Sequence, residues 1–191
     1  KFLDVMVRVF DHIAKRFGPR RGQRRGYPGH QEIELALVKL YRLEGEQRYL
    51  DLASFFINER GAKPSFFDRE RKARNWPPHW SDALGLEFYQ AHAPVREQKH
   101  AVGHAVRAMY MYCGMADVAR ETADRELVKA LKTLWRNVVD RRMYVTGAVG
   151  TVGHGERFTR DYDLPNGATG EFGAPNNIFR NNGQGFFIDA T

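Results

Sequence analysis

The chain has 191 residues, of which 42% are hydrophobic and 13% aromatic, and it carries a formal net charge of +7 at pH 7. This composition excludes a disordered tail and is typical of a globular piece of protein with a sizeable core. No apolar run approaches the roughly 20 residues that cross a bilayer, so the sequence predicts no membrane span. The single cysteine excludes an internal disulfide framework and a metal site built from several cysteines of this chain, and we expect a cytoplasmic location.

The first predicted element is an amphipathic helix over residues 1–17, whose apolar side chains recur near helical spacing. Gly18 and Pro19 end it. Because Lys1 already lies inside this pattern, we expect the natural N-terminus to be missing. The lack of a signal peptide then says little about export.

The next two helices are predicted over residues 31–44 and 46–60, where apolar side chains again share a face. Gly45 separates the two helices and Gly61 follows the second, which favours a helical hairpin. Residues 62–80 hold prolines and tryptophans, and we predict an ordered aromatic loop there rather than a linker.

A second hairpin is predicted from helices over residues 95–111 and 123–143, with a turn at Gly114. Each hairpin begins with a histidine, His30 in the first and His104 in the second. Repeated helical hairpins bury their apolar faces against their neighbours, so we predict an all-α fold that forms part of a barrel or solenoid. Two or three hairpins are too few to close a ring, and we expect the chain to belong to something larger.

Much of the positive charge lies in the loop PRRGQRRG, at Arg20, Arg21, Arg24 and Arg25. A nucleic-acid-binding protein typically spreads such charge along a face and pairs it with a reading element, and the sequence contains no such element. We therefore predict a solvated loop and no nucleic acid partner, with an anionic partner as the alternative.

Histidines in the stretch HAPVREQKHAVGH raise the question of a metal site. His100 and His104 are four residues apart, which would place them on one helical face, as in a zinc-binding helix. Ala101 stands where that motif has a glutamate, so a core or cleft histidine is the favoured interpretation. His30, at a helix start, could bind a substrate hydroxyl or be satisfied by backbone groups.

Glu156 is the most suggestive carboxylate, because it lies in the Gly-rich stretch GHGERF beside Phe158 and Tyr162, with Asp161 and Asp163 close by. Such surroundings can tune a carboxyl group to give and take a proton, as glycosidases require. From composition alone, a loop carboxylate that caps a turn explains the residue equally well.

Three segments together resemble glycoside hydrolase family 127, the β-L-arabinofuranosidase-like enzymes. They are GYPGHQEIELALVKLYRLEGEQRYLDLASFFINERG, PVREQKHAVGHAVRAMYMYCGMADVA, and RRMYVTGAVG followed by GERF and DYDLPN. The resemblance implies part of an (α/α)6 barrel over residues 1–166. It also implies retaining hydrolysis, with a zinc-bound cysteine thiolate as nucleophile and a glutamate as acid/base. By position, Glu156 matches the acid/base, and His30 and His104 match histidines that hold the sugar.

The zinc ligands are where the sequence departs from the family. DYDLPN should be followed by a Glu-x-Cys segment and a later cysteine pair, whereas here it is followed by GATGEFGAPNN. Glu171 sits one position early, and Cys113 lies in a remote motif. We therefore expect no metal-binding residues in this chain. We interpret residues 167–191 as a non-matching Gly/Asn-rich tail, such as a shifted reading frame or a fragment end would produce.

The sequence thus predicts a partial β-L-arabinofuranosidase-like domain, whose substrates would be arabinofuranosyl-containing oligosaccharides or glycoconjugates. Without the cysteine nucleophile and its zinc, we expect no appreciable activity from the chain as it stands. Two alternatives stay open. One is a sugar-binding domain that does not cleave, and the other is a helical-repeat module that binds an anionic partner through the basic loop.

Overall fold

A computed structural model describes residues 1–77, 83–144, 147–150, 152, 155–158, 161, 179–181 and 187–189. The described α-helices are α1 (Phe2–Arg16), α2 (Ile33–Glu44), α3 (Gln47–Glu59), α4 (Phe66–Arg74), α5 (Ala105–Thr122) and α6 (Arg125–Arg141). A 3-10 helix, η2 (Leu86–Tyr89), and two strands, β1 (Phe179–Asn181) and β2 (Phe187–Asp189), complete the described elements. Across these ranges, no helix is long and apolar enough to cross a membrane.

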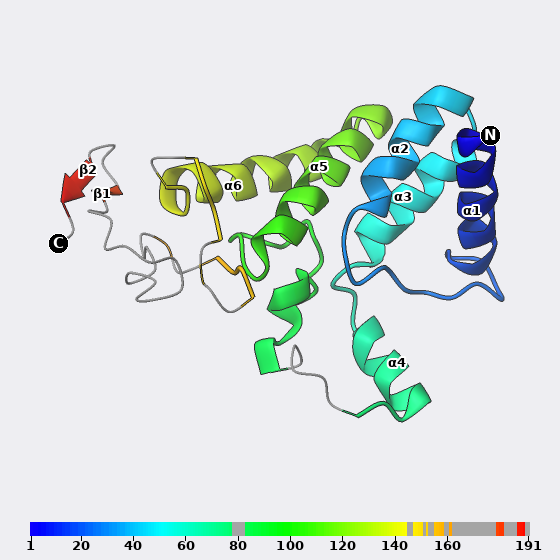
Figure 1. Cartoon of the computed structure of the whole chain (residues 1–191), viewed down its shortest axis with the longest axis horizontal. Coiled ribbons are helices and arrows are strands. Elements are labelled where there is room, and N and C mark those ends of the chain that lie inside the picture. Colours follow the sequence, from blue (N-terminus) through cyan, green and yellow to red (C-terminus); the bar gives the residue numbers. More distant parts are fainter. Residues whose placement is uncertain are drawn as a thin grey trace.

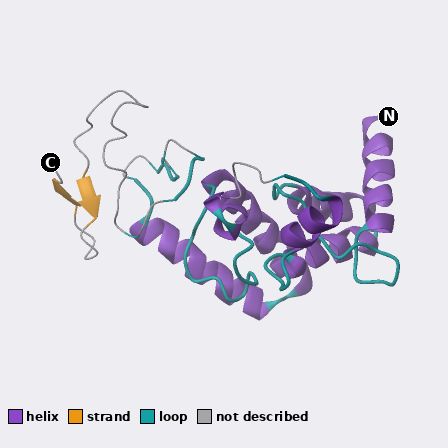
Figure 2. Cartoon of the chain, turned by 90° about the horizontal axis from the view of Figure 1, so that it is seen from below, coloured by secondary structure: helices purple, strands orange, loops and turns teal. Residues whose placement is uncertain are grey.

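Two helical hairpins form the centre of the molecule, as predicted, with α2 beside α3 and α5 joined to α6 (Figure 1). Gly45 closes the first hairpin in the left-handed conformation, with φ of 72°. Asp124 begins α6 by accepting a 2.8 Å hydrogen bond from the backbone N–H of Leu127. α5 packs against both α2 and α3, and α1 packs against α3. Helices make up most of the described chain. The strand pair lies at the end of the molecule opposite the N-terminal helix α1 (Figure 2).

The core lies where the two hairpins meet. Most of its fully buried side chains come from α2, α3, α5 and α6, and they include Leu37, Tyr49, Met115 and Leu134. Burial of such side chains supplies the main driving force for packing these helices together.

The second hairpin differs from its prediction at both ends of its first helix. The helix expected over residues 95–111 begins only at Ala105, and it runs through Gly114 to Thr122 instead of turning there. A Cβ added at Gly114 would lie 3.0 Å from the Cβ of Glu34, so this glycine permits close helix packing rather than a turn. His100 therefore lies outside the helix, and the predicted helical face shared by His100 and His104 is wrong.

The segment predicted as a loop over residues 62–80 contains α4. None of the side chains of this helix is fully buried, so its sequence lacks the apolar stripe from which a helix is predicted. In the region predicted as an unpatterned tail, β1 and β2 form an antiparallel pair in which Arg180 lies opposite Ile188. The all-α prediction did not include these strands. Most of residues 167–191, Glu171 among them, lies outside the described residues.

Candidate active site

The structure brings His30, His104 and Glu156 together from three separate segments. His30 precedes α2 and His104 is the N-cap residue of α5, and their ring centroids lie 6.2 Å apart. The Nε2 atom of His104 lies 3.4 Å from Oε2 of Glu156. The side chain of Glu156 is 64% exposed and that of His104 is 16% exposed, so the cluster opens to solvent at the carboxylate.

Hydrogen bonding at the start of α5 determines which nitrogen of His104 carries the proton. Its Nδ1 accepts the backbone N–H of Arg107 at 3.4 Å, so the proton of the neutral ring lies on Nε2. Burial lowers the pKa of His104, the Arg107 charge lowers it further, and Glu156 opposes both. A neutral His104 can therefore donate its Nε2–H to the Glu156 carboxylate or to a ligand hydroxyl.

Backbone hydrogen bonds hold the segment that carries Glu156. The N–H of Ala105 donates to the Glu156 carbonyl at 2.9 Å, and the N–H of Phe158 donates to the Gly103 carbonyl at 2.9 Å. Glu156 has φ of 45°, a left-handed conformation that is uncommon for residues other than glycine. A Cβ on Gly103 would meet the Glu87 carbonyl oxygen at 1.9 Å, so this position next to His104 requires glycine.

A network of buried polar side chains contacts the backbone next to both histidines. The Gln90 side-chain amide donates to the carbonyl of His104 at 3.1 Å and to that of Val102 at 2.8 Å. Its oxygen accepts a 2.7 Å hydrogen bond from the amide of Gln31, the residue after His30. Gln31 and Gln90 are both fully buried. One pair of amides therefore links the backbone beside His30 to the backbone of His104.

Arg60 completes this network. Its guanidinium donates to the Pro28 carbonyl at 2.7 Å and to the Tyr89 carbonyl at 2.9 Å, and it lies 3.9 Å from Glu34. Burial lowers the pKa of Arg60 to about 10, while Glu34 and Tyr27 oppose that shift. Burial raises the pKa of Glu34, and the Arg60 charge opposes the rise. The burial of Arg60 and Glu34 was not predicted from the sequence, because charged side chains in a helical hairpin are typical of surface positions.

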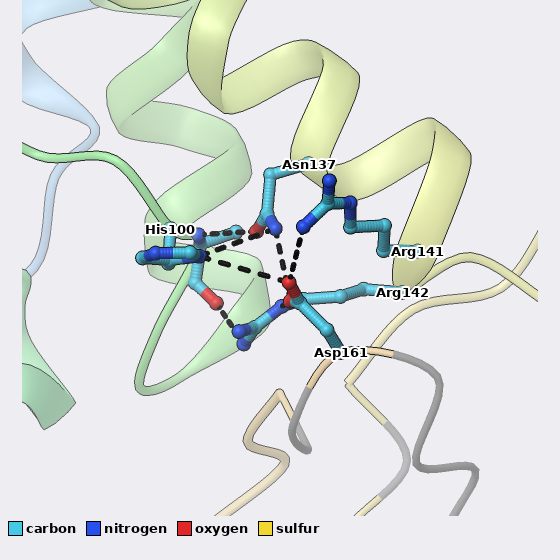
Figure 3. A network of polar contacts seen from close by, with 6 residues as sticks. His100, Asn137, Arg141, Arg142 and Asp161 are labelled. Atoms are coloured by element: carbon cyan, nitrogen blue, oxygen red, sulfur yellow. Dashed lines mark hydrogen bonds and ion pairs between the residues drawn. The ribbon is translucent and has the colours of Figure 1, made fainter. Parts of the chain in front are cut away.

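The loop that carries Glu156 has a second anchor at Asp161 (Figure 3). Asp161 accepts hydrogen bonds from Asn137 at 2.9 Å, Arg141 at 3.0 Å and Arg142 at 2.8 Å, all near the end of α6. His100 lies 3.8 Å from the same carboxylate, so it serves this anchor and not the site at His104. Although partial burial raises it, these hydrogen bonds together lower the pKa of Asp161 to about 2.

The described residues do not fit a zinc site. In the described ranges no group of three or more His, Cys, Asp or Glu side chains could hold a metal ion. Cys113, the chain's single cysteine, is exposed on α5. It lies nine residues after His104, about 14 Å along the helix axis. The candidate Glu171 lies outside the described residues.

The basic loop is partly neutralised. Arg25 forms a bidentate pair with Glu59, with contacts of 2.7 and 3.3 Å, and Arg24 lies 3.5 Å from Glu70. Arg20 and Arg21 line a cavity beside α1 that also contains the carboxylates of neighbouring residues. The mixture of charges weakens the case for an anionic partner at this loop.

Glycoside hydrolases use a carboxyl group to protonate the leaving oxygen, and a carboxylate beside two histidines at one mouth of the hairpins is compatible with that class of enzyme. The comparisons with known proteins place the chain more narrowly. The family model described as β-L-arabinofuranosidase, GH127 catalytic domain, matches residues 1–177, and the chain belongs to this family. The match extends past residue 166, where the motifs had placed the end of the resemblance.

The relatives share this description. A protein of Bifidobacterium longum named non-reducing end β-L-arabinofuranosidase is 47% identical over 167 residues, which make up 86% of this chain and 25% of that protein. The solved structure of Ara127N-Se, a GH127 β-L-arabinofuranosidase from Geobacillus stearothermophilus T6, is 54% identical with a TM-score of 0.82 over 86% of this chain and 26% of that one. The GH127 β-arabinofuranosidase BT3674 is 41% identical with a TM-score of 0.73, over 86% and 23% of the two chains. The chain thus spans about a quarter of the length of these relatives.

Proposed function

We propose that this chain supplies the acid/base and two sugar-binding side chains of a β-L-arabinofuranosidase. The single observation that supports the proposal is the meeting of His30, His104 and Glu156, whose segments lie far apart in the sequence. The substrate would be an oligosaccharide or glycoconjugate with an arabinofuranosyl group at its non-reducing end. This substrate class is the one for which the Bifidobacterium longum relative is named.

In the proposed reaction, Glu156 protonates the oxygen of the leaving group and later accepts a proton from the attacking water. Its exposed carboxylate lies at the open side of the cluster, where a glycosidic oxygen can reach it. His104 donates its Nε2–H and His30 offers a ring nitrogen, and together they orient the sugar ring. The backbone pairing beside His104 keeps the acid at a fixed distance from this histidine.

We assign no nucleophile to this chain. The family resemblance implies a zinc-bound cysteine, but Cys113 is exposed and remote from His104 along α5. Protonation of the leaving group alone does not form a glycosyl-enzyme intermediate. The 191-residue chain by itself should therefore bind the sugar without releasing arabinose. This expectation also makes sugar binding without cleavage the second candidate function.

The experiment uses a hybrid in which the chain replaces the corresponding quarter of the Geobacillus stearothermophilus relative. The 54% identity and TM-score of 0.82 make this exchange feasible. We expect the hybrid to release L-arabinose from a β-L-arabinofuranoside, and Glu156→Gln to lower kcat by about a hundredfold or more.

The matched control is Glu126→Gln, which changes an exposed glutamate in the first turn of α6 and should leave kcat unchanged. A Glu156→Gln hybrid with full activity would contradict the acid/base role. A hybrid that binds the sugar without cleaving it would favour the second candidate.

A further inference from the structure

We propose that an aromatic pocket beside the histidines binds the sugar ring on the leaving-group side of the scissile bond. This inference rests on the proposed function, because it defines a second binding position for the same substrate. The pocket has a volume of about 490 Å³. It lies between α4 with the residues that follow it and the 3-10 helix η2, and Tyr27 and Gly29 also line it.

The pocket adjoins the site at two points. Gly29 lines it and His30 is the next residue, so their Cα atoms are about 3.8 Å apart. A Cβ added at Gly29 would meet no atom within 4 Å, so the wall of the pocket is open at this residue. On the other side, Tyr89 lines the pocket and its ring packs at 5.1 Å against Phe88, whose ring packs at 5.5 Å against His104.

Aromatic side chains form the walls. The ring of Phe67 lies 5.2 Å from that of Tyr27 and 4.8 Å from that of Tyr89, so the three rings pack together, with buried Tyr27 supporting the other two. Trp76 adds an indole that is 55% exposed. The guanidinium of Arg74 lies 4.7 Å from the centre of this indole and pairs with Glu70 at 2.9 Å, which holds the indole in place.

The charged side chains at the same pocket are Asp68, Glu70 and Arg71. Asp68 is 61% exposed, and its ion pair with Arg71 is long, at 3.9 Å. Glu70 also lines the pocket. A sugar ring matches this combination, because it presents an apolar C–H face to aromatic rings and hydroxyl donors to carboxylates. Two carboxylates against one guanidinium in the lining favour a neutral, hydroxyl-bearing occupant over an anionic one.

The test compares two ligands on the 191-residue chain by calorimetry. One is methyl β-L-arabinofuranoside, and the other is a disaccharide in which the same arabinofuranosyl group is linked to a second arabinose. We expect the disaccharide to bind about tenfold more tightly, and Trp76→Ala to remove that advantage while leaving the methyl glycoside unaffected. Trp135→Ala is the matched control, because Trp135 is a similarly exposed tryptophan on α6, 61% exposed and away from the pocket. Far-ultraviolet circular dichroism checks that each variant is folded.

The outcomes separate the two proposals. If the methyl glycoside binds but the disaccharide gains nothing, the pocket inference is wrong and the proposed function stands. If only the disaccharide binds, and Trp76→Ala abolishes that binding, the pocket inference stands and the proposed role of the histidines fails. Failure of both ligands to bind overturns the inference, as does an equal gain from a phenyl β-L-arabinofuranoside. If Trp76→Ala does not fold, Asp68→Asn replaces it, and an unchanged disaccharide affinity in that variant contradicts the inference.

Discussion

The two histidines and the carboxylate that they face are held in place by different means. His30 and His104 rest on a fully buried network in which Gln31, Gln90 and Arg60 donate to backbone carbonyls. Glu156 lies on an exposed loop that is fixed by backbone pairing with the residues around His104 and by the Asp161 anchor. The part of the site that carries the two histidines should therefore be as stable as the core, whereas the part that carries Glu156 should depend on surface charge and pH.

The largest effect is expected from removing the buried cation of the network. Arg60→Met deletes the donors to the Pro28 and Tyr89 carbonyls and leaves Glu34 without its counter-charge. We expect a loss of about 3 kcal/mol in the free energy of unfolding, measured by urea denaturation. Arg120→Met, at an exposed position of α5, should leave the midpoint unchanged. Equal midpoints for the two variants would show that the network does not support the site.

The Asp161 anchor gives the next largest effect, and its sign follows from the lowered pKa. A carboxyl group with a usual pKa of 3.8 that falls to about 2 in the folded state stabilises the protein above pH 3.8. That contribution is about 2 kcal/mol and is lost as the pH falls from about 4 to 2.

Asp161→Asn should therefore lower the free energy of unfolding at pH 7 and reduce its pH dependence below pH 4. Asp140→Asn, at an exposed carboxylate on α6, is the control. Thermal unfolding curves between pH 2 and 7 measure both variants. A pH profile of Asp161→Asn identical to that of the unchanged protein would contradict the anchor.

The smallest effect on stability is expected at His104, whose side chain caps α5 and also faces Glu156. His104→Ala removes the side chain that caps α5, which should cost about 1 kcal/mol in the free energy of unfolding. His104→Asn can keep the cap and should restore stability, yet it lacks the ring that faces Glu156. Chemical denaturation of both variants, with sugar binding in parallel, tests this separation. Restored binding in His104→Asn would mean that only the cap matters.

The family motifs identified the three candidate site residues in the sequence, but they did not predict the contacts that hold those residues in place. His30, His104 and Glu156 were found through segments that resemble the family, and their meeting depends on the pairing of residues 103–105 with 156–158. Helical periodicity carries no information about such loop-to-loop contacts.

Buried polar residues and packing glycines account for what the sequence left unpredicted. Arg60 at the end of α3 looks like a solvated cap, and its burial becomes evident only when the 27–31 and 88–91 loops are in place. Gly114 looked like a turn because a glycine that permits helix contact and one that ends a helix look the same in sequence. The sequence of α4 is rich in charged residues and has no helical apolar pattern, so this helix was not predicted. It forms one wall of the aromatic pocket.

The central claim is that His30, His104 and Glu156 form one sugar site, and calorimetric binding of methyl β-L-arabinofuranoside to the 191-residue chain tests it most directly. We predict that the unchanged chain binds the sugar, that His104→Asn weakens binding at least tenfold at unchanged stability, and that Glu156→Gln, which keeps the shape of the side chain, binds nearly as well. Equal affinity of the unchanged chain and His104→Asn would contradict the claim.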